Sequence, residues 1–185
     1  MFSIIIPTYN EASGIAQTIC RIYTANGTHK AEIIVVDGGS TDETIAIAKQ
    51  CGATVIKSER KGRAAQMNKG ASVAKHEMLY FLHADSFPPQ NFTGQIVDAY
   101  NKGSKSGCFR LAFDCQHWFL RANAWFTRLN VNAVRFGDQS LFVTKDVFQK
   151  ADGFREDLLM MEDQEIIHRL KKYSKFKVLN DVVIT

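Results

Sequence analysis

Acidic residues follow two apolar runs near the start of the chain. Glu11 comes shortly after the run at 2–6, and Asp37 comes directly after the run at 33–36. Continuous β-branched runs predict strands buried on both faces, and the helix-start residues behind each run predict two βα units of a parallel sheet. Ligands in such sheets bind where the strands end. We therefore expect Tyr9, Glu11 and Asp37 to meet at one edge, where carboxylates accept hydrogen bonds from a small polar ligand.

Helix capping is the alternative role for these acids. Ser40 and Glu43 have the spacing of a capping box, at the start of a helix that we expect to continue to about Gln50. Because this pair would satisfy the first turn of that helix, Asp37 is not needed as its cap. This reasoning favours ligand binding for Asp37.

The rest of the chain continues the α/β pattern. A charged loop at 58–62 precedes a helix that carries Ala64, Met67 and Ala71, and Pro88 and Pro89 suit the first turn of a later helix. The remaining elements are predicted as a helix at 11–25, strands at 54–57, 78–82, 108–113, 140–144 and 176–185, and helices at 117–134 and 162–173. We predict a single α/β domain over residues 1–185, with a mostly parallel central sheet and helices on both faces.

Size and charge narrow the class of protein. The chain has 185 residues, a formal net charge of +4 and scattered basic residues, apart from a group at 57–63. This excess suits an anionic small molecule or a lipid head group as well as nucleic acid. Of these partners, we expect no nucleic acid. An apolar run long enough for a membrane span and a signal peptide are both missing, which predicts a cytoplasmic protein. A last apolar strand that reaches Thr185 suggests that the natural protein continues beyond it.

Five motifs in order resemble those of the family-two glycosyltransferases. They are Ile-Ile-Ile-Pro-Thr-Tyr-Asn-Glu at 4–11, Val-Val-Asp-Gly-Gly-Ser-Thr-Asp at 35–42, Gly-Arg-Ala with Asn-Lys-Gly at 62–70, Phe-Leu-His-Ala-Asp at 81–85 and Met-Glu-Asp at 161–163. The resemblance implies a GT-A-like fold, a nucleotide-diphosphate sugar as substrate, a divalent metal (Mg²⁺ or Mn²⁺) and transfer with inversion. The substrate-binding residues that it implies are Pro7, Thr8, Tyr9, Glu11, Asp37, Arg60, Arg63, His83, Ala84, Asp138 and Glu162.

Asp85 is the expected metal ligand. A departing pyrophosphate develops negative charge, and a hard cation held by a carboxylate neutralises that charge while it keeps water and phosphate ligands. The family commonly has two aspartates separated by one residue here, and His83 takes the place of the first, which in the family contacts ribose. The alternative role for Asp85 is to cap the turn before Pro88.

Asp163 is the expected base that deprotonates the acceptor hydroxyl. On the predicted helix it shares a stripe with Ile166, Ile167 and Leu170, which must face the protein. Glu162 is predicted on the solvent face instead. The resemblance implies the same choice, because the second acid of this pair is the usual base. Without the family resemblance, Asp163 could equally be a partner of the helix dipole.

A stripe of tryptophan and arginine is predicted on the helix at 117–134. Such a mixture suits a peripheral contact with the inner face of a membrane, or a lipid-linked acceptor. Packing against the domain and a subunit contact in a homo-oligomer are the alternatives. The stripe consists of Trp118, Arg121, Trp125, Arg128, Asn132 and Arg135.

Other functions fit the motifs less well. A dinucleotide-dependent oxidoreductase should have G-x-G-x-x-G after its first strand, whereas residues 7–11 contain no glycine. A nucleotidyltransferase that forms sugar nucleotides should have a glycine-rich, basic first turn, and the absence of such a turn argues against this class as well. The non-enzymatic alternative is a nucleotide-sugar binding module that lacks catalytic activity, which the histidine at 83 makes plausible.

Overall fold

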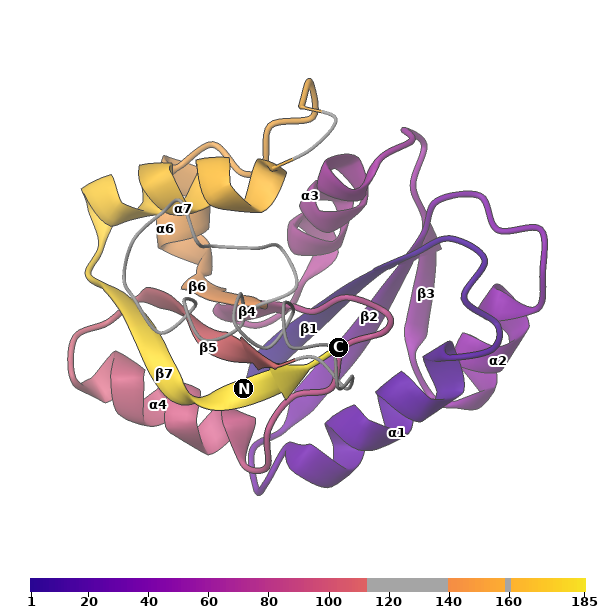
Figure 1. The fold of residues 1–185 in the computed structure, drawn as a ribbon. Helices are drawn as coiled ribbons and strands as arrows, with labels where there is room; N and C mark the ends of the chain where they lie inside the picture. Colours follow the sequence, from indigo (N-terminus) through magenta and orange to yellow (C-terminus); the bar gives the residue numbers. More distant parts are fainter. Residues whose placement is uncertain (113–139, 159–160) are drawn as a thin grey trace.

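One seven-stranded sheet lies at the centre of the chain (Figure 1). The computed structural model describes residues 1–112, 140–158 and 161–185. The strands are β1 Phe2–Thr8, β2 Ala31–Asp37, β3 Thr54–Lys57, β4 Met78–Phe81, β5 Ser106–Ala112, β6 Leu141–Thr144 and β7 Phe176–Ile184. The helices are α1 Ile15–Ala25, α2 Thr44–Gln50, α3 Arg63–Val73, α4 Phe92–Asn101, α6 Lys145–Lys150 and α7 Glu162–Tyr173.

The sheet is mostly parallel, as the sequence predicts. The strand order is β3-β2-β1-β4-β6-β5-β7. The neighbours β3, β2, β1 and β4 all run parallel, and β5 is parallel to β7. Only β6 runs against its two neighbours, β4 and β5, within the described sheet. The carboxyl ends of β1, β2, β3 and β4 therefore share one edge, where ligands of parallel sheets bind.

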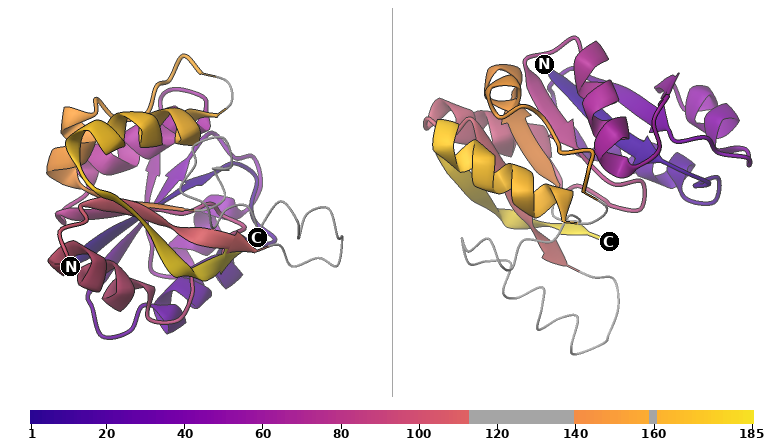
Figure 2. Two further views of the ribbon diagram at one scale, coloured as in Figure 1. Left: turned by 60° about the vertical axis from the view of Figure 1, so that its left-hand side comes forward. Right: turned by 90° about the horizontal axis from the view of Figure 1, so that it is seen from above.

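Helices cover both faces of the sheet. Helices α1, α2 and α4 lie on one face, and α3, α6 and α7 lie on the other (Figures 1 and 2). Strand β1 is buried along its whole length because alternate side chains enter two separate cores. Ile4 and Ile6 pack with the first helix layer, whereas Ile5 packs with the second. This two-sided burial explains why the strand shows no polar alternation.

Helix α3 approaches the sheet closely at Gly70. The helix packs on β1 and β2, and a Cβ atom added at Gly70 would lie 2.4 Å from Ile5 Cγ2 and 3.0 Å from Val36 Cγ2. A larger side chain would push the helix away from both strands. Gly70 therefore sets the distance between α3 and the part of the sheet that ends at the candidate site.

Two helix starts differ from the prediction. Helix α1 begins at Ile15 instead of near residue 11. Helix α4 begins at Phe92, after the left-handed Asn91, so Pro88 and Pro89 do not occupy its first turn. The reason is tertiary, because Phe87 and Ile184 exchange backbone hydrogen bonds of 2.8 and 3.1 Å, which hold this segment against the end of β7. The predicted helix at 117–134, with its tryptophan–arginine stripe, lies outside the described residues.

Among the helices in the described ranges, none combines the length and the apolar character that a bilayer crossing requires.

Gly70→Ala should destabilise the protein. The added methyl group enters a space that Ile5 already fills, and overpacking of this kind costs about 1–3 kcal/mol of unfolding free energy. Urea denaturation measures the change. Gly14→Ala is the matched control, because a Cβ there meets no atom within 4 Å, and it should stay within about 0.5 kcal/mol of the wild type. Equal stability of both variants would contradict this account of α3 packing.

Candidate functional site

Side chains from three strands meet in one row at the carboxyl edge of the sheet. Thr8 at the end of β1 pairs in register with Asp37 of β2, which in turn pairs with Lys57 of β3. The chain after β4 runs beside them, because the Leu82 N–H donates to the Ile5 carbonyl at 3.1 Å. The parallel register thus brings the first two motifs and the segment 83–85 to one edge.

Asp37 closes the turn that follows its strand. The side chain is fully buried, and its carboxylate accepts hydrogen bonds from the backbone N–H groups of Gly39 at 3.0 Å and Ser40 at 3.1 Å. The predicted capping box of Ser40 and Glu43 is wrong, since α2 begins at Thr44 and the Ser40 hydroxyl accepts from the Asn10 N–H at 2.9 Å. Asp37 therefore has a local structural task, which is to close the turn at Gly39 and Ser40 and not to cap α2.

The loops after β1 and β2 are bonded to each other. The Asn10 side chain accepts from the Thr41 N–H at 2.9 Å, the Glu11 N–H donates to Thr44 Oγ1 at 2.8 Å, and the Ala12 N–H donates to Asp42 at 3.1 Å. Side chains of one loop thus satisfy backbone groups of the other. These hydrogen bonds between the two loops hold the backbone at Glu11 in place.

Gln66 is a supporting residue that sequence reasoning missed. Its side chain is buried, and the amide nitrogen donates to the carbonyls of Thr8 at 2.8 Å and Val36 at 2.7 Å. It thereby attaches α3 to the ends of β1 and β2. A polar residue on the buried side of a helix, among small apolar residues, was the available signal for such a role.

Glu11 and Asp85 lie close enough to repel each other. The pKa of Glu11 is raised above its ordinary value, first because of partial burial and then because of the negative charges of Asp85 and Asp42. Asp85 itself is exposed. Carboxylates that converge at one exposed edge are a suitable environment for a bound cation.

The turn that carries Asp85 is anchored on both sides. The Thr18 hydroxyl of α1 donates to the Ala84 carbonyl. The Ser86 hydroxyl lies 2.9 Å from Thr185 Oγ1 and donates to Asp85 Oδ1 at 3.4 Å. His83 is half-buried at the same turn. In the described part of the chain, no three acidic, histidine or cysteine side chains gather as a complete metal cage.

A second cluster joins the start of α3 to the start of α7. Arg63 Nε donates to Glu162 Oε1 at 2.5 Å. The Glu162 side chain is 4% exposed and that of Arg63 is 44% exposed. The predicted solvent-facing position of Glu162 is therefore wrong, because Glu162 is buried and bonded to Arg63 at the start of α3. Asp163 is buried, as predicted.

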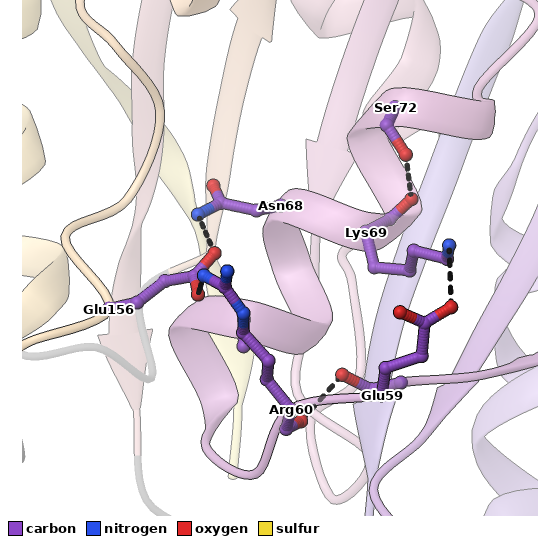
Figure 3. A pocket seen from close by; sticks show the side chains of 8 residues that line it. Glu59, Arg60, Asn68, Lys69, Ser72 and Glu156 are labelled. Carbon is purple, nitrogen blue, oxygen red and sulfur yellow. Dashed lines mark hydrogen bonds and ion pairs between the residues drawn. The ribbon is translucent and has the colours of Figure 1, made fainter.

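An outer set of contacts lies beside this pair (Figure 3). Arg60 and Asn68 both point toward the Glu156 carboxylate, at 2.8 and 3.0 Å. These contacts lower the pKa of Glu156, with the bond from Asn68 as the larger cause. Asn68 also exchanges two hydrogen bonds with the backbone of Phe154. Arg60 is 79% exposed, so its ion pair is expected to contribute little to stability.

Two pockets flank these contacts. One, of about 320 Å³, lies over the outer set in Figure 3 and includes Glu59, Arg60 and Lys69 in its lining. The other, of about 330 Å³, is lined by residues at the α3–α7 joint, including Lys61, Arg63, Leu158 and Glu162. The lining of the second pocket combines the basic Lys61 and Arg63 with the carboxylates of Glu156 and Glu162 and an apolar wall, so an anionic group would have to bind at the basic side chains.

The predicted site residues fall into two groups. The sheet edge brings together Pro7, Thr8, Tyr9, Glu11, Asp37, His83, Ala84 and Asp85, of which Tyr9 is 61% exposed and Pro7, Thr8, Ala84 and Asp37 are buried. The α3–α7 joint brings together Arg60, Arg63, Glu162 and Asp163, with the predicted roles still untested. Asp138 lies outside the described residues.

Solved structures with this fold are glycosyltransferases of the GT-A class. S. aureus TarS in complex with UDP superposes over 100% of this chain and 60% of its own, with a TM-score of 0.82 and 19% identity. A mannosyltransferase from Pyrobaculum calidifontis, in complex with GDP-Man and Mn²⁺, superposes over 100% of this chain and 56% of its own, with a TM-score of 0.81 and 20% identity.

The chain belongs to Glycosyl transferase family 2, whose model matches residues 3–159. An uncharacterized glycosyltransferase of Mycobacterium tuberculosis is 32% identical over 117 residues, which are 60% of this chain and 45% of the relative. The dolichol-phosphate mannosyltransferase of Pyrococcus furiosus is 28% identical over 107 residues, which are 55% of this chain and 30% of that protein. The match thus spans less than half the length of these curated relatives.

Glu11→Gln should stabilise the ligand-free protein at neutral pH. The raised pKa of Glu11 means that the folded state favours the protonated form, so this group's contribution is fully present below the unfolded pKa of about 4.3 and is lost as pH rises through the folded pKa. The neutral glutamine side chain does not lose this contribution to stability as the pH rises. The Tm difference from wild type should be positive at pH 7 and should shrink toward pH 4. The exposed Glu59→Gln is the control, and a lower Tm for Glu11→Gln at pH 7 would refute the repulsion.

Proposed function

We propose that this chain is the catalytic domain of an enzyme that transfers a sugar from a nucleotide-diphosphate sugar to a hydroxyl acceptor. The observation that carries the proposal is the convergence of Glu11 and Asp85 at the carboxyl edge of the sheet, in a chain of Glycosyl transferase family 2. Structural neighbours crystallised with UDP, UDP-GlcNAc or GDP-Man support a sugar nucleotide as the substrate class.

The nucleoside is proposed to lie against the loop after β1. Tyr9 offers an exposed ring for contact with the base. Glu11 is the carboxylate with capacity to accept hydrogen bonds from base or ribose, because Asp37 is buried and bonded to its own turn. His83, half-buried beside Asp85, takes a ribose-side position. Asp37 therefore supports the site by holding the turn, in addition to any ligand contact.

The diphosphate is proposed to extend from Asp85 toward Arg63. Asp85 would hold a divalent cation with phosphate oxygens and water, and such a charge would offset the negative charges of Asp85 and Asp42, which add to burial in raising the pKa of Glu11. When bound, such an ion would offset negative charge on the departing diphosphate. Arg63 supplies a fixed positive charge from the other side, and a guanidinium matches the geometry of phosphate oxygens.

Asp163 is proposed as the base for a single displacement with inversion. The acceptor oxygen forms a bond to the anomeric carbon while the bond from that carbon to the phosphate oxygen breaks. The hydroxyl proton passes to the Asp163 carboxylate, and the nucleoside diphosphate leaves with the bonding electrons. The buried position of Asp163 at the first turn of α7 limits its access to water, which suits a group that accepts a proton from a bound acceptor.

Asp85→Asn should abolish the metal-dependent part of nucleotide binding. The amide keeps the size of the side chain but removes the charge that holds a hard cation. Calorimetry with UDP and GDP, each with and without MnCl₂, measures the difference. The exposed Asp98→Asn on α4 is the matched control, and its binding should equal that of wild type. Wild-type Mn²⁺-dependent affinity in Asp85→Asn would disprove this assignment.

Asp163→Asn should bind the sugar nucleotide but lose turnover. Removal of a general base typically costs about 10²- to 10⁴-fold in rate. The assay is release of nucleoside diphosphate from a panel of sugar nucleotides, with candidate hydroxyl acceptors and Mn²⁺. Asp157→Asn, which removes an exposed acid paired locally with Arg155, is the control. Unchanged turnover in Asp163→Asn would assign the base elsewhere, and a wild type that binds without releasing product would favour a binding module.

A further inference from the structure

We propose that Glu162 is a positioning residue whose carboxylate holds the Arg63 guanidinium in the orientation that binds the diphosphate. This contact sets the proposed phosphate-binding side chain on α3 relative to the proposed base Asp163 on α7. The inference rests on the proposed function, which gives Arg63 and Asp163 their roles. It assigns Glu162 a task within the protein, in place of the direct substrate contact predicted from the sequence.

The contact is buried on one side and accessible on the other. The Glu162 carboxylate is almost completely enclosed, whereas nearly half of the Arg63 side chain is exposed. An enclosed carboxylate that keeps its charge needs a charged partner. The guanidinium therefore cannot leave Glu162 without a large cost, while its accessible part can still meet a ligand.

Arginine chemistry allows both contacts together. A guanidinium has five N–H donors in a rigid planar fork, and the bond from Nε to Glu162 uses one of them. The other N–H groups lie in the same plane, so the bond to Glu162 helps to set the directions in which they point. Arg63 and Glu162 both line the pocket of about 330 Å³ at the α3–α7 joint. An anion in this pocket would meet a guanidinium that is already oriented.

The local backbone supports this arrangement from both ends. Gly62 has a φ of 109° immediately before α3, so the chain turns sharply and Arg63 becomes the first helical residue. On the other element, the left-handed Met161 (φ 66°) precedes Glu162 at the first position of α7. Each partner thus begins its helix, and Asp163 follows Glu162 directly. A shift in the start of α3 would move Arg63, and a shift in the start of α7 would move Glu162 and Asp163 together.

The neighbouring contacts reinforce the joint without replacing it. Asn68 bonds to Phe154 and Glu156 from the next turns of α3. The Arg60–Glu156 pair is solvent-exposed, so its strength is limited by solvent and salt. In the Arg63–Glu162 pair the carboxylate is enclosed although the arginine is 44% exposed, so this pair is screened less than the outer pair and has the larger capacity to fix geometry.

The sign of one measurement separates this role from simple electrostatics. A carboxylate beside an anion site repels the ligand, so its neutralisation alone should tighten diphosphate binding. If Glu162 acts by orienting Arg63, its neutralisation should weaken binding instead. A purely structural role would change stability and leave the affinity of the folded protein unaltered.

A double-mutant cycle tests the proposal. We would measure the Kd for UDP and for GDP with MnCl₂ by calorimetry in wild type, Glu162→Gln, Arg63→Ala and the double variant, with Tm recorded for each. Each single variant should weaken binding by roughly tenfold, and the double variant should be no weaker than Arg63→Ala, as expected for residues that act as one unit. Glu165→Gln is the matched control, because it neutralises another acid in the first turn of α7, paired there with Arg169.

The outcomes are distinct. Unchanged or tighter binding in Glu162→Gln, or fully additive losses in the double variant, would overturn the proposal. Equal weakening in Glu165→Gln would assign the effect to charge at the helix start and would also overturn it. Glu162→Asp, which keeps the charge but withdraws the carboxylate, is the second variant if Glu162→Gln fails to fold, and it should also weaken binding. A wild type that binds neither nucleotide would instead refute the proposed function.

Discussion

The burial of β1 between two layers of helices is the constraint on which the site depends. A strand with apolar side chains on both faces is stable only in the middle of a covered sheet. That position places β2 on one side of it and β4 on the other, all in parallel. Because parallel strands end at the same edge, Thr8, Asp37 and the turn with Asp85 become neighbours although the sequence separates them widely.

The same edge concentrates negative charge from Glu11, Asp42 and Asp85. Asp37 and Asp42 use their carboxylates to close local turns, whereas Glu11 remains partly buried beside Asp85 with a raised pKa. Asp37 and Asp42 therefore stabilise the loops, whereas Glu11 and Asp85 keep a repulsive arrangement. Unfavourable electrostatics at a well-packed edge is characteristic of a site that a ligand completes.

Helix α3 connects the two halves of the site. Gly70 brings it close to β1 and β2, Gln66 bonds to the ends of those strands, and Asn68 and Arg63 reach the segment around α7. One helix thus contacts the carboxyl edge of the sheet on one side and the segment that carries Glu162 and Asp163 on the other. A rigid helix can hold two groups of side chains at a fixed separation more reliably than loops can.

Local patterns in the sequence determined the strands, the parallel sheet and the acids at its edge. Apolar runs such as 33–36 indicate strands that are buried on both faces. The order of the motifs gave the family resemblance, which the match to the family model confirms. The buried position of Asp163 also followed from its helical stripe.

Only the tertiary structure decided which distant segments cover or bond these elements. A helical pattern assigns Glu162 to solvent, but its side chain is buried and paired with Arg63 from the start of α3. Likewise Ser40 bonds to Asn10 instead of capping α2, and the pairing of Phe87 with Ile184 holds the chain at Pro88 and Pro89 out of helix α4. The physical reason is that spacing along the chain reports side-chain periodicity, whereas hydrogen-bond partners depend on what lies across the fold.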